Sequence, residues 1–188
     1  MSSTPDHIPA GRILLTYEDY VGLPNDGKRY EILDGELFVT PAPVPLHQRV
    51  SRNLERLLDR HVVGGALGEI LHAPIDVILS PTTIAQPDIL FIRAGRDIVT
   101  RRAVEAPPDL VVEILSPSSL RQDRVTKAAL YARFGVPHYW IVDPEARRID
   151  AYELEGGTYR LTAEARGTDV LRSSLFAGLE IALADVWP

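Results

Sequence analysis

The chain has 188 residues, of which 45% are hydrophobic, which is enough for one compact domain and too few for a second full-sized one. It contains no cysteine; this excludes disulfides, cysteine nucleophiles and cysteine-ligated zinc, fits a reducing compartment, and leads us to expect a cytoplasmic protein. The net charge of −6 argues against the broad basic surface of a non-specific nucleic-acid-binding protein.

Basic residues can nevertheless gather locally. The two candidate groups are Arg49, Arg52 and Arg56, and Arg121, Arg124 and Lys127. A solvated helix face is the commoner explanation for such a group.

Residues 1–12 are polar, contain Asp6 and prolines, and lack an apolar core, so they do not form a secretory signal. No run approaches the roughly 18 apolar residues of a membrane span. We therefore expect a flexible tail over 1–12, a single domain over 13–188, and no membrane partner.

The first half predicts a short helix, a hairpin and a long helix. Thr16 caps a helix over Tyr17–Val21. The strands Tyr30–Leu33 and Glu36–Thr40 flank Asp34-Gly35, a dipeptide that tolerates positive φ and favours a hairpin. Apolar residues at helical spacing predict a helix over Leu46–Val63, which Gly64-Gly65 ends.

The second half predicts a sheet covered on both faces. The runs Asp88–Arg93 and Asp109–Ser116 do not alternate with polar residues, which is typical of central strands between helices. The other expected elements are extended segments at Glu69–Leu71 and Ile75–Leu79, a helix over Gln122–Phe134, a strand over Tyr139–Val142, and a hairpin of Ile149–Leu154 and Tyr159–Thr162 around Gly156-Gly157. The predicted fold class is α/β, a mixed central sheet flanked by helices with N-terminal and C-terminal β-hairpins.

Glu113 lies within the apolar run Leu110–Leu115, on a strand that should be buried. Burying an unpaired ionised carboxylate is costly, so Glu113 needs a cation, a metal ion or several hydrogen-bond donors. A structural pair with an arginine, or a position at a sheet edge, is an equal alternative to a metal ligand.

Asp88 follows Pro87 at the start of the neighbouring apolar strand. Taken alone it is a turn aspartate, but paired with Glu113 it makes a hard-oxygen site that suits Mg²⁺ or Mn²⁺. Asp109 is a rival that we favour less, because it lies four residues from Glu113 on the same strand, about 13 Å away when extended.

Lys127 shares a helical stripe with Leu130, Tyr131 and Phe134, which places it on the sheet-facing side. We interpret it as an ammonium group held near the carboxylates, where it can orient water or stabilise charge on a phosphate. The alternative is a simple i, i+4 ion pair with Asp123.

Three further residues are weaker candidates for contact with a phosphate or DNA: Ser116, Ser118 and Arg124. A turn or a helix cap is the commoner role of such serines. The five histidines have no metal-ligand spacing, and the chain lacks the glycine-rich motifs of serine hydrolases and nucleotide-binding enzymes.

Together these segments resemble the Uma-type family of restriction-endonuclease-like proteins, in the PD-(D/E)xK nuclease superfamily. The matching pieces are Tyr30–Leu37, Pro87–Ile89, Val112–Ser118, Lys127 with Tyr131, and Gly135–Pro144. The resemblance implies that two acids and a lysine bind a divalent ion and activate water for phosphodiester hydrolysis.

The resemblance has one departure, because Leu115 stands where the motif places its lysine. The family's lysine on the following helix corresponds to Lys127. Glu31 matches a further recurrent acidic position and is a candidate ligand, with a surface residue of the hairpin as the equal alternative. We therefore expect a Mg²⁺- or Mn²⁺-dependent DNA endonuclease with catalytic Asp88, Glu113 and Lys127, the first two binding the metal. The alternative is an inactive nuclease fold that binds DNA or protein. Cutting both strands of a duplex favours a homodimer.

Overall fold

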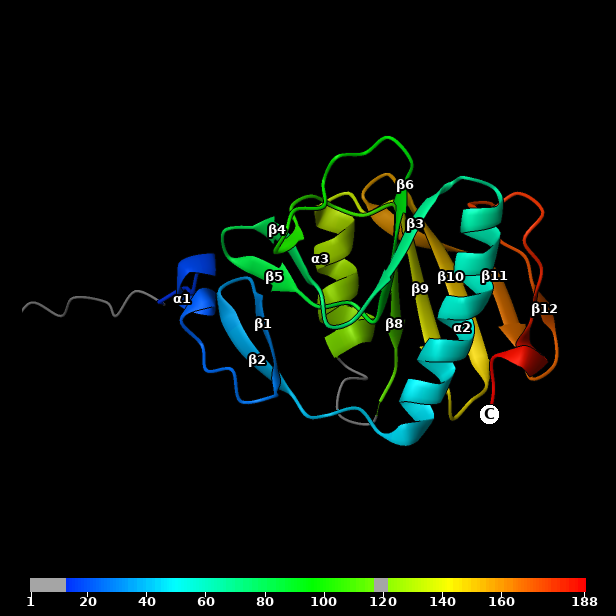
Figure 1. Ribbon diagram of the computed structural model, residues 1–188, viewed down its shortest axis with the longest axis horizontal. Coiled ribbons are helices and arrows are strands. Elements are labelled where there is room, and N and C mark those ends of the chain that lie inside the picture. The colour runs from blue at the N-terminus through cyan, green and yellow to red at the C-terminus, as the bar shows by residue number, and fades with distance from the viewer. Residues whose placement is uncertain (1–12, 117–121) are drawn as a thin grey trace, which may run out of the picture.

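The computed structural model describes residues 13–116 and 122–188, which form two large sheets, one two-stranded sheet (Val170–Leu171 with Ile181–Ala182) and three α-helices. The expected tail 1–12, Ser118 and Arg121 lie outside the described residues. In chain order the elements are α1 (Tyr17–Val21), β1 (Arg29–Leu33), β2 (Glu36–Thr40), α2 (Pro45–Gly64), β3 (Gly68–His72), β4 (Asp76–Ser80), β5 (Thr83–Ala85), β6 (Ile89–Arg93), β7 (Ala103–Val104), β8 (Leu110–Ile114), the π-helical segment η1 (Gln122–Lys127), α3 (Ala128–Arg133), β9 (His138–Asp143), β10 (Arg148–Glu155), β11 (Thr158–Arg166), β12 (Val170–Leu171), β13 (Ile181–Ala182) and the short 3₁₀ turn η2 (Leu183–Asp185) (Figure 1).

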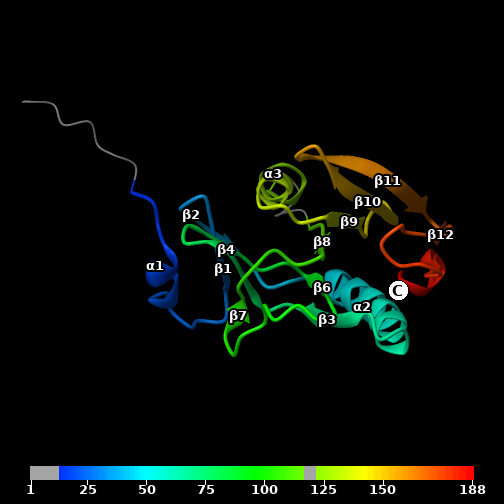
Figure 2. The same cartoon turned by 90° about the horizontal axis from the view of Figure 1, so that it is seen from above.

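The central sheet has six strands in the order β11-β10-β9-β8-β6-β3. Only β8 and β9 run parallel; the other neighbours are antiparallel. Helices α2 and α3 lie on opposite faces of this sheet (Figure 2). The predicted mixed sheet flanked by helices is confirmed, as are the two hairpins: β10–β11 belongs to this sheet and β1–β2 to a second one.

Strand β8 shows why its sequence does not alternate with polar residues. Leu110, Val112 and Ile114 pack in the core beneath α2, whereas Val111 and Leu115 pack in the core beneath α3. Successive side chains of a strand point to opposite faces. Glu113 therefore belongs to the α3 face, and a carboxylate enters an otherwise apolar layer.

The second sheet has the order β2-β1-β5-β4-β7 and lies between α1 and the central sheet (Figures 1 and 2). Its β1–β2 hairpin turns at Asp34 and Gly35, with φ of 52° and 77°, so the positive-φ hairpin turn predicted from this dipeptide is confirmed. Strand β5 belongs to this sheet and β6 to the central sheet, with only residues 86–88 between them. Asp88 therefore lies where the two sheets meet.

The helix predicted over Gln122–Phe134 is present but not regular. Its first part, Gln122–Lys127, is π-helical, and only Ala128–Arg133 is α-helical. Apolar spacing indicates which residues face the sheet, whereas a π turn depends on backbone hydrogen-bond partners that this spacing does not encode. The sheet-facing stripe itself is present, because Lys127 and Tyr131 are buried.

Four short strands, β5, β7, β12 and β13, were not predicted, since two or three residues are too few to display a period. Among the described residues, no helix is long and apolar enough to cross a membrane.

Candidate active site

Three acidic side chains are buried where the two sheets meet. Asp88 directly precedes β6, and Glu113 lies in β8; these strands are neighbours, with Ile89 opposite Val112. Glu31 comes from β1. The exposed fractions of Asp88, Glu113 and Glu31 are 4%, 2% and 1%. Burial removes the water that would solvate these charges, so each needs partners from the protein.

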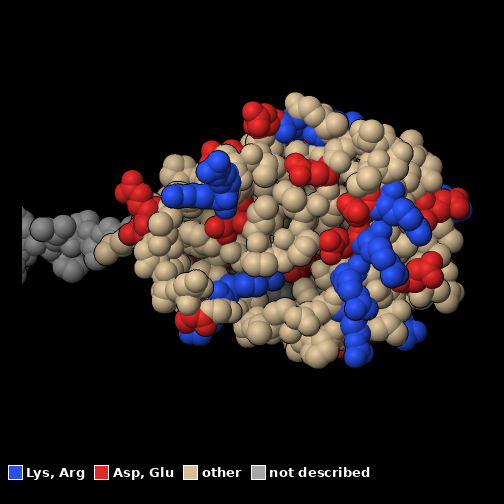
Figure 3. Space-filling model, viewed as in Figure 1, with Lys and Arg blue, Asp and Glu red and all other residues tan. Residues whose placement is uncertain are grey.

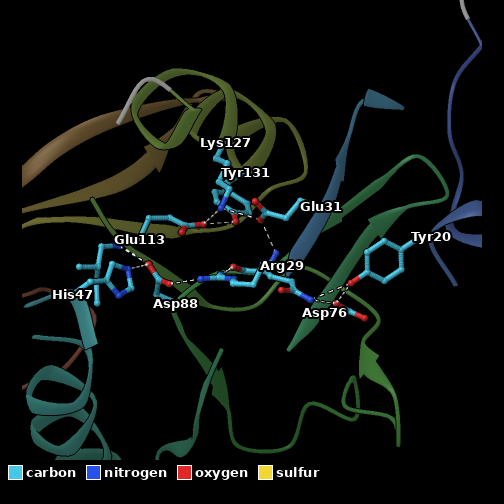
Figure 4. Close-up of polar contacts among 11 residues, drawn as sticks. Tyr20, Arg29, Glu31, His47, Asp76, Asp88, Glu113, Lys127 and Tyr131 are labelled. Atoms are coloured by element: carbon cyan, nitrogen blue, oxygen red, sulfur yellow. Dashed lines mark hydrogen bonds and ion pairs between the residues drawn. The ribbon is translucent and has the colours of Figure 1, made fainter. Parts of the chain in front are cut away.

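Asp88 receives hydrogen bonds from three directions (Figure 4). The Ile114 N–H donates to Oδ2 at 2.8 Å, and the His47 Nε2 lies 3.1 Å from the same oxygen. The Arg29 Nη1 donates to Oδ1 at 3.0 Å. Burial raises the pKa of Asp88, but His47, Arg29 and the Ile114 N–H outweigh it and lower that pKa to about 2. Asp88 is therefore held as a carboxylate.

Lys127 lies between the two glutamates, as Figure 4 shows. Its Nζ is 2.9 Å from the Glu31 Oε1 and 3.0 Å from the Glu113 Oε1. The Tyr131 hydroxyl donates to the same Glu113 oxygen at 2.8 Å, and burial raises the pKa of Tyr131 well above its usual value. The structure thus brings together Glu31, Glu113 and Lys127, three of the candidates from the sequence.

Arg29 is a residue of this cluster that the sequence did not indicate. Its guanidinium donates to Asp88 and to the Gln86 carbonyl, and its buried Nε has no hydrogen-bond partner. Burial lowers the pKa of Arg29. The carboxylates of Asp88, Glu31 and Glu113 together have the larger, opposite effect, so the pKa is raised overall. The sequence feature that could have indicated Arg29 is its position two residues before Glu31, because residues i and i+2 lie on one face of a strand.

His47 was also missed, because the histidines were judged only by metal-ligand spacing. It lies in the first turn of α2, on the buried stripe that continues with Val50 and Leu54, and it is 8% exposed. Its Nε2 contacts Asp88, while its buried Nδ1 has no hydrogen-bond partner. The helical periodicity that placed Val50 and Leu54 inside would have placed His47 there too.

A second polar network adjoins the carboxylates through Gln86. The Gln86 N–H donates to the Glu31 Oε1 at 2.8 Å. Its side-chain amide donates to Asp76 at 2.7 Å and to the Tyr20 hydroxyl at 3.0 Å, and that hydroxyl donates to Asp76 at 2.6 Å. Arg29, Gln86 and Tyr20 also line a cavity of about 650 Å³. The cluster is therefore reached from a cavity beside α1 and β1.

The rival Asp109 is engaged elsewhere. Its carboxylate lies 2.8 Å from Arg96 and 3.7 Å from Arg93, just before β8. Leu115, at the position of the motif lysine, is 5% exposed and packs in the α3-side core. Neither residue contributes a charge to the cluster of Asp88 and Glu113.

The weaker candidates are dispersed. Ser116 lines a cavity of about 300 Å³ together with His47. Arg124 instead pairs with Asp143 at 3.4 Å and with Asp150 at 3.9 Å. Ser118 lies outside the described residues. Of the two that the structure describes, Ser116 lies beside a residue that contacts Asp88, and Arg124 does not.

The carboxylates of this cluster could supply only some of the ligands of a hard divalent ion. Over residues 13–116 and 122–188, no three His, Asp or Glu side chains are placed to share a metal ion. Mg²⁺ is commonly bound by one or two carboxylates, with water or substrate oxygens completing its shell. Asp88 and Glu113 fit that chemistry, provided that Arg29 gives way at the Asp88 Oδ1.

Comparisons with known proteins agree with this description. The "Uncharacterized protein slr1290" of Synechocystis sp. is 29% identical over 127 residues, which are 66% of each chain, so the match spans just under two thirds of that relative. The crystal structure of "a putative nuclease belonging to DUF820" from Anabaena variabilis matches with a TM-score of 0.75 and 16% identity, covering 92% of this chain and 97% of that one. The likeness shows a shared fold. The sequence model of the Uma2 family, described as "Putative restriction endonuclease", matches residues 17–184. That match spans most of the chain and confirms the resemblance seen in the motifs: the protein belongs to the Uma2 family.

Proposed function

We propose that the protein is a Mg²⁺- or Mn²⁺-dependent endonuclease that hydrolyses DNA phosphodiester bonds, with Asp88 and Glu113 as the metal ligands. One observation carries the proposal: two carboxylates are buried in or just before neighbouring strands, and a buried lysine contacts one of them. When bound, the divalent ion would lower the pKa of a water ligand and offset charge on the scissile phosphate. Family membership supports the same reaction class.

The charges of the cluster suit a phosphodiester substrate. Glu31, Asp88 and Glu113 contribute three negative charges, and Arg29 and Lys127 contribute two positive ones. The protein groups alone are therefore net negative by one charge. A divalent ion would reverse this balance to net positive by one charge, which complements the single negative charge of a phosphodiester.

We assign to Lys127 the role of contacting the phosphate of the substrate. Its ammonium is already fixed by two carboxylate contacts, so little side-chain entropy is lost when it meets a developing negative charge. Glu31 holds it from the side opposite to Glu113, and we assign Glu31 a positioning role. Tyr131 restrains the Glu113 carboxylate by a hydrogen bond from its hydroxyl.

His47 positions Asp88 by a contact of 3.1 Å to the Asp88 Oδ2, which leaves Oδ1 to Arg29. Residues that orient a metal ligand in this way affect metal affinity without touching the ion. Ser116 shares a cavity with His47 and is the serine that we assign to phosphate contact.

The test is calorimetric titration with Mn²⁺ of the wild type and of the Asp88→Asn/Glu113→Gln double variant. These substitutions keep the size of the side chains and remove their charges. We expect one Mn²⁺ per chain for the wild type and none for the double variant; unchanged binding would exclude this site. An Asp109→Asn variant is the matched control, because Asp109 is an aspartate with a side chain only 13% exposed, in an ion pair outside the cluster.

Cleavage is tested by nicking of supercoiled DNA with Mg²⁺ or Mn²⁺, comparing the wild type with Lys127→Met. We expect nicking by the wild type and a loss of at least a hundredfold in the variant, as for removal of one group that stabilises charge in the transition state. An Arg124→Met variant should retain its activity, since Arg124 pairs with Asp143 and Asp150 instead.

A specific observation also supports a second function, that of an inactive nuclease fold that binds DNA or protein. Arg29 and Lys127 already neutralise two of the three carboxylates without any metal ion, and Leu115 replaces the motif lysine. No nicking under either metal, together with no Mn²⁺ binding, would favour this function over the first.

A further inference from the structure

Four arginines form one row along the outer face of α2. They are Arg49, Arg52, Arg56 and Arg60, and all four are exposed. Their spacing of three or four residues keeps them on one side of a helix, opposite to buried residues such as Leu54 and Leu58. Figure 3 shows the row as a column of basic side chains over α2, beside a hollow in the same face.

Ion pairs within the protein do not account for this row. Over residues 13–116 and 122–188, no carboxylate lies within 4.0 Å of any of the four guanidinium groups. The acidic residues on the same helix are Glu55 and Asp59, and Glu55 lies 3.8 Å from His72 instead. Like charges at i, i+4, such as Arg52 and Arg56, destabilise a helix. The row therefore adds a small repulsion within the helix, and its four exposed guanidinium groups are accessible to a partner of opposite charge.

The row begins at the end of α2 that reaches the candidate active site, but on the other side of the helix. His47, in the first turn of α2, contacts Asp88, and Arg49 is two residues further along the helix. From Arg49 to Arg60 the helix advances about 16 Å, at about 1.5 Å per residue. A partner lying along the row would thus have one end at the first turns of α2, whose buried side carries His47.

We propose that this arginine row is the docking surface for the phosphate backbone of duplex DNA, on the outer side of the helix whose first turn contacts Asp88. The inference rests on the proposed function, and the row is a local basic surface on a chain whose net charge is −6. Charge complementarity carries it, because the backbone of a duplex offers a phosphate every 3.4 Å or so along each strand. Single-stranded DNA is usually held by aromatic stacking platforms, and α2 contains no aromatic residue of the Phe, Tyr or Trp type.

The experiment measures binding of a fluorescent 30-base-pair duplex by anisotropy in EDTA, over a series of salt concentrations. The test variant is R52Q/R56Q/R60Q. We expect its dissociation constant to rise at least tenfold at low salt, and the slope of log affinity against log salt to fall in magnitude by about 2 to 3, near 0.9 per lost phosphate contact.

Two controls separate the row from general effects of charge. The variant R160Q/R166Q/R172Q removes the same number of positive charges, from arginines that pair with Glu155, Glu164 and Glu180. It should bind within about twofold of the wild type. The variant R52K/R56K/R60K keeps the charges and should retain most of the affinity. Circular dichroism checks that all three variants are folded.

Each of three outcomes would overturn the inference. Both glutamine variants could lose duplex affinity equally, R52Q/R56Q/R60Q could bind the duplex as the wild type does, or the wild type could bind only single strands. Failure of the proposed function looks different. If the row is required for duplex binding but no metal supports nicking, the docking surface stands and the nuclease assignment falls. If wild type and R52Q/R56Q/R60Q both nick and bind alike, the nuclease stands and the docking surface falls.

Discussion

Replacing Arg29 with glutamine should make the protein bind Mn²⁺ more tightly, although an arginine in a nuclease site is ordinarily expected to help. In the structure Arg29 donates to the Asp88 Oδ1 at 3.0 Å, while the Ile114 N–H and His47 share the other oxygen. A metal ion that takes Oδ1 must therefore displace Arg29. The substitution removes that competitor and makes the cluster more negative by one charge.

The size of the effect follows from the bond that is lost. A hydrogen bond to a charged group contributes about 1.5 to 3 kcal/mol, so Arg29→Gln should lower the Mn²⁺ dissociation constant by about 10- to 150-fold. The metal-free variant should be less stable than the wild type, because the buried Asp88 loses its counter-ion. Mn²⁺ should then raise the melting temperature of the variant more than that of the wild type.

Calorimetric titration and thermal melting at several Mn²⁺ concentrations measure both quantities. Arg133→Gln is the matched control: it removes the same charge from a surface pair with Asp34, whose two side chains are about half exposed, and should leave Mn²⁺ affinity unchanged. Arg29→Lys should fall between the wild type and the glutamine variant. If Arg29→Gln binds Mn²⁺ as the wild type does or more weakly, Arg29 does not compete with the metal ion and the reasoning fails.

Three further predictions concern neighbouring residues and assembly. His47→Ala should weaken Mn²⁺ binding by about 10- to 100-fold, as for loss of a partner that orients a metal ligand; calorimetry showing no change would remove His47 from the site. In EDTA, the depressed pKa of Asp88, about 2 against 3.8 for the free side chain, should contribute about 2 kcal/mol of stability that is complete above pH 3.8 and is lost as pH falls toward 2. Urea unfolding between pH 4 and pH 2 should accordingly show a shallower loss for Asp88→Asn than for the wild type, and parallel curves would contradict this. Equilibrium sedimentation should find a dimer, as cleavage of both strands favours; a monomer at all concentrations would argue against it.

Local patterns in the sequence predicted most of the elements that build the site. The Asp34-Gly35 turn, the long helix α2 and the central strands β6 and β8 follow from residue conformations and periods that involve only neighbours along the chain. The need for a partner at Glu113 also follows from the sequence, because apolar residues on both sides of it imply burial.

The partners themselves could not be predicted in the same way. Arg29 and Asp88 are 59 residues apart, and His47 and Asp88 are 41 apart. A period tells which face a side chain occupies, but not which segment packs against that face. Nor does the sequence show that Asp109 pairs with Arg96, whereas Asp88 lies near Arg29 and His47.

The sequence by itself thus determined that this chain forms a mixed sheet between helices, and that a carboxylate lies buried in its centre. Tertiary structure alone decided that Lys127 is shared by Glu31 and Glu113, and that Arg29 occupies the free side of Asp88. Both facts depend on β1 of one sheet lying against β6 and β8 of the other. That packing buries charges which water would otherwise solvate, so the groups must neutralise one another across the boundary between the sheets.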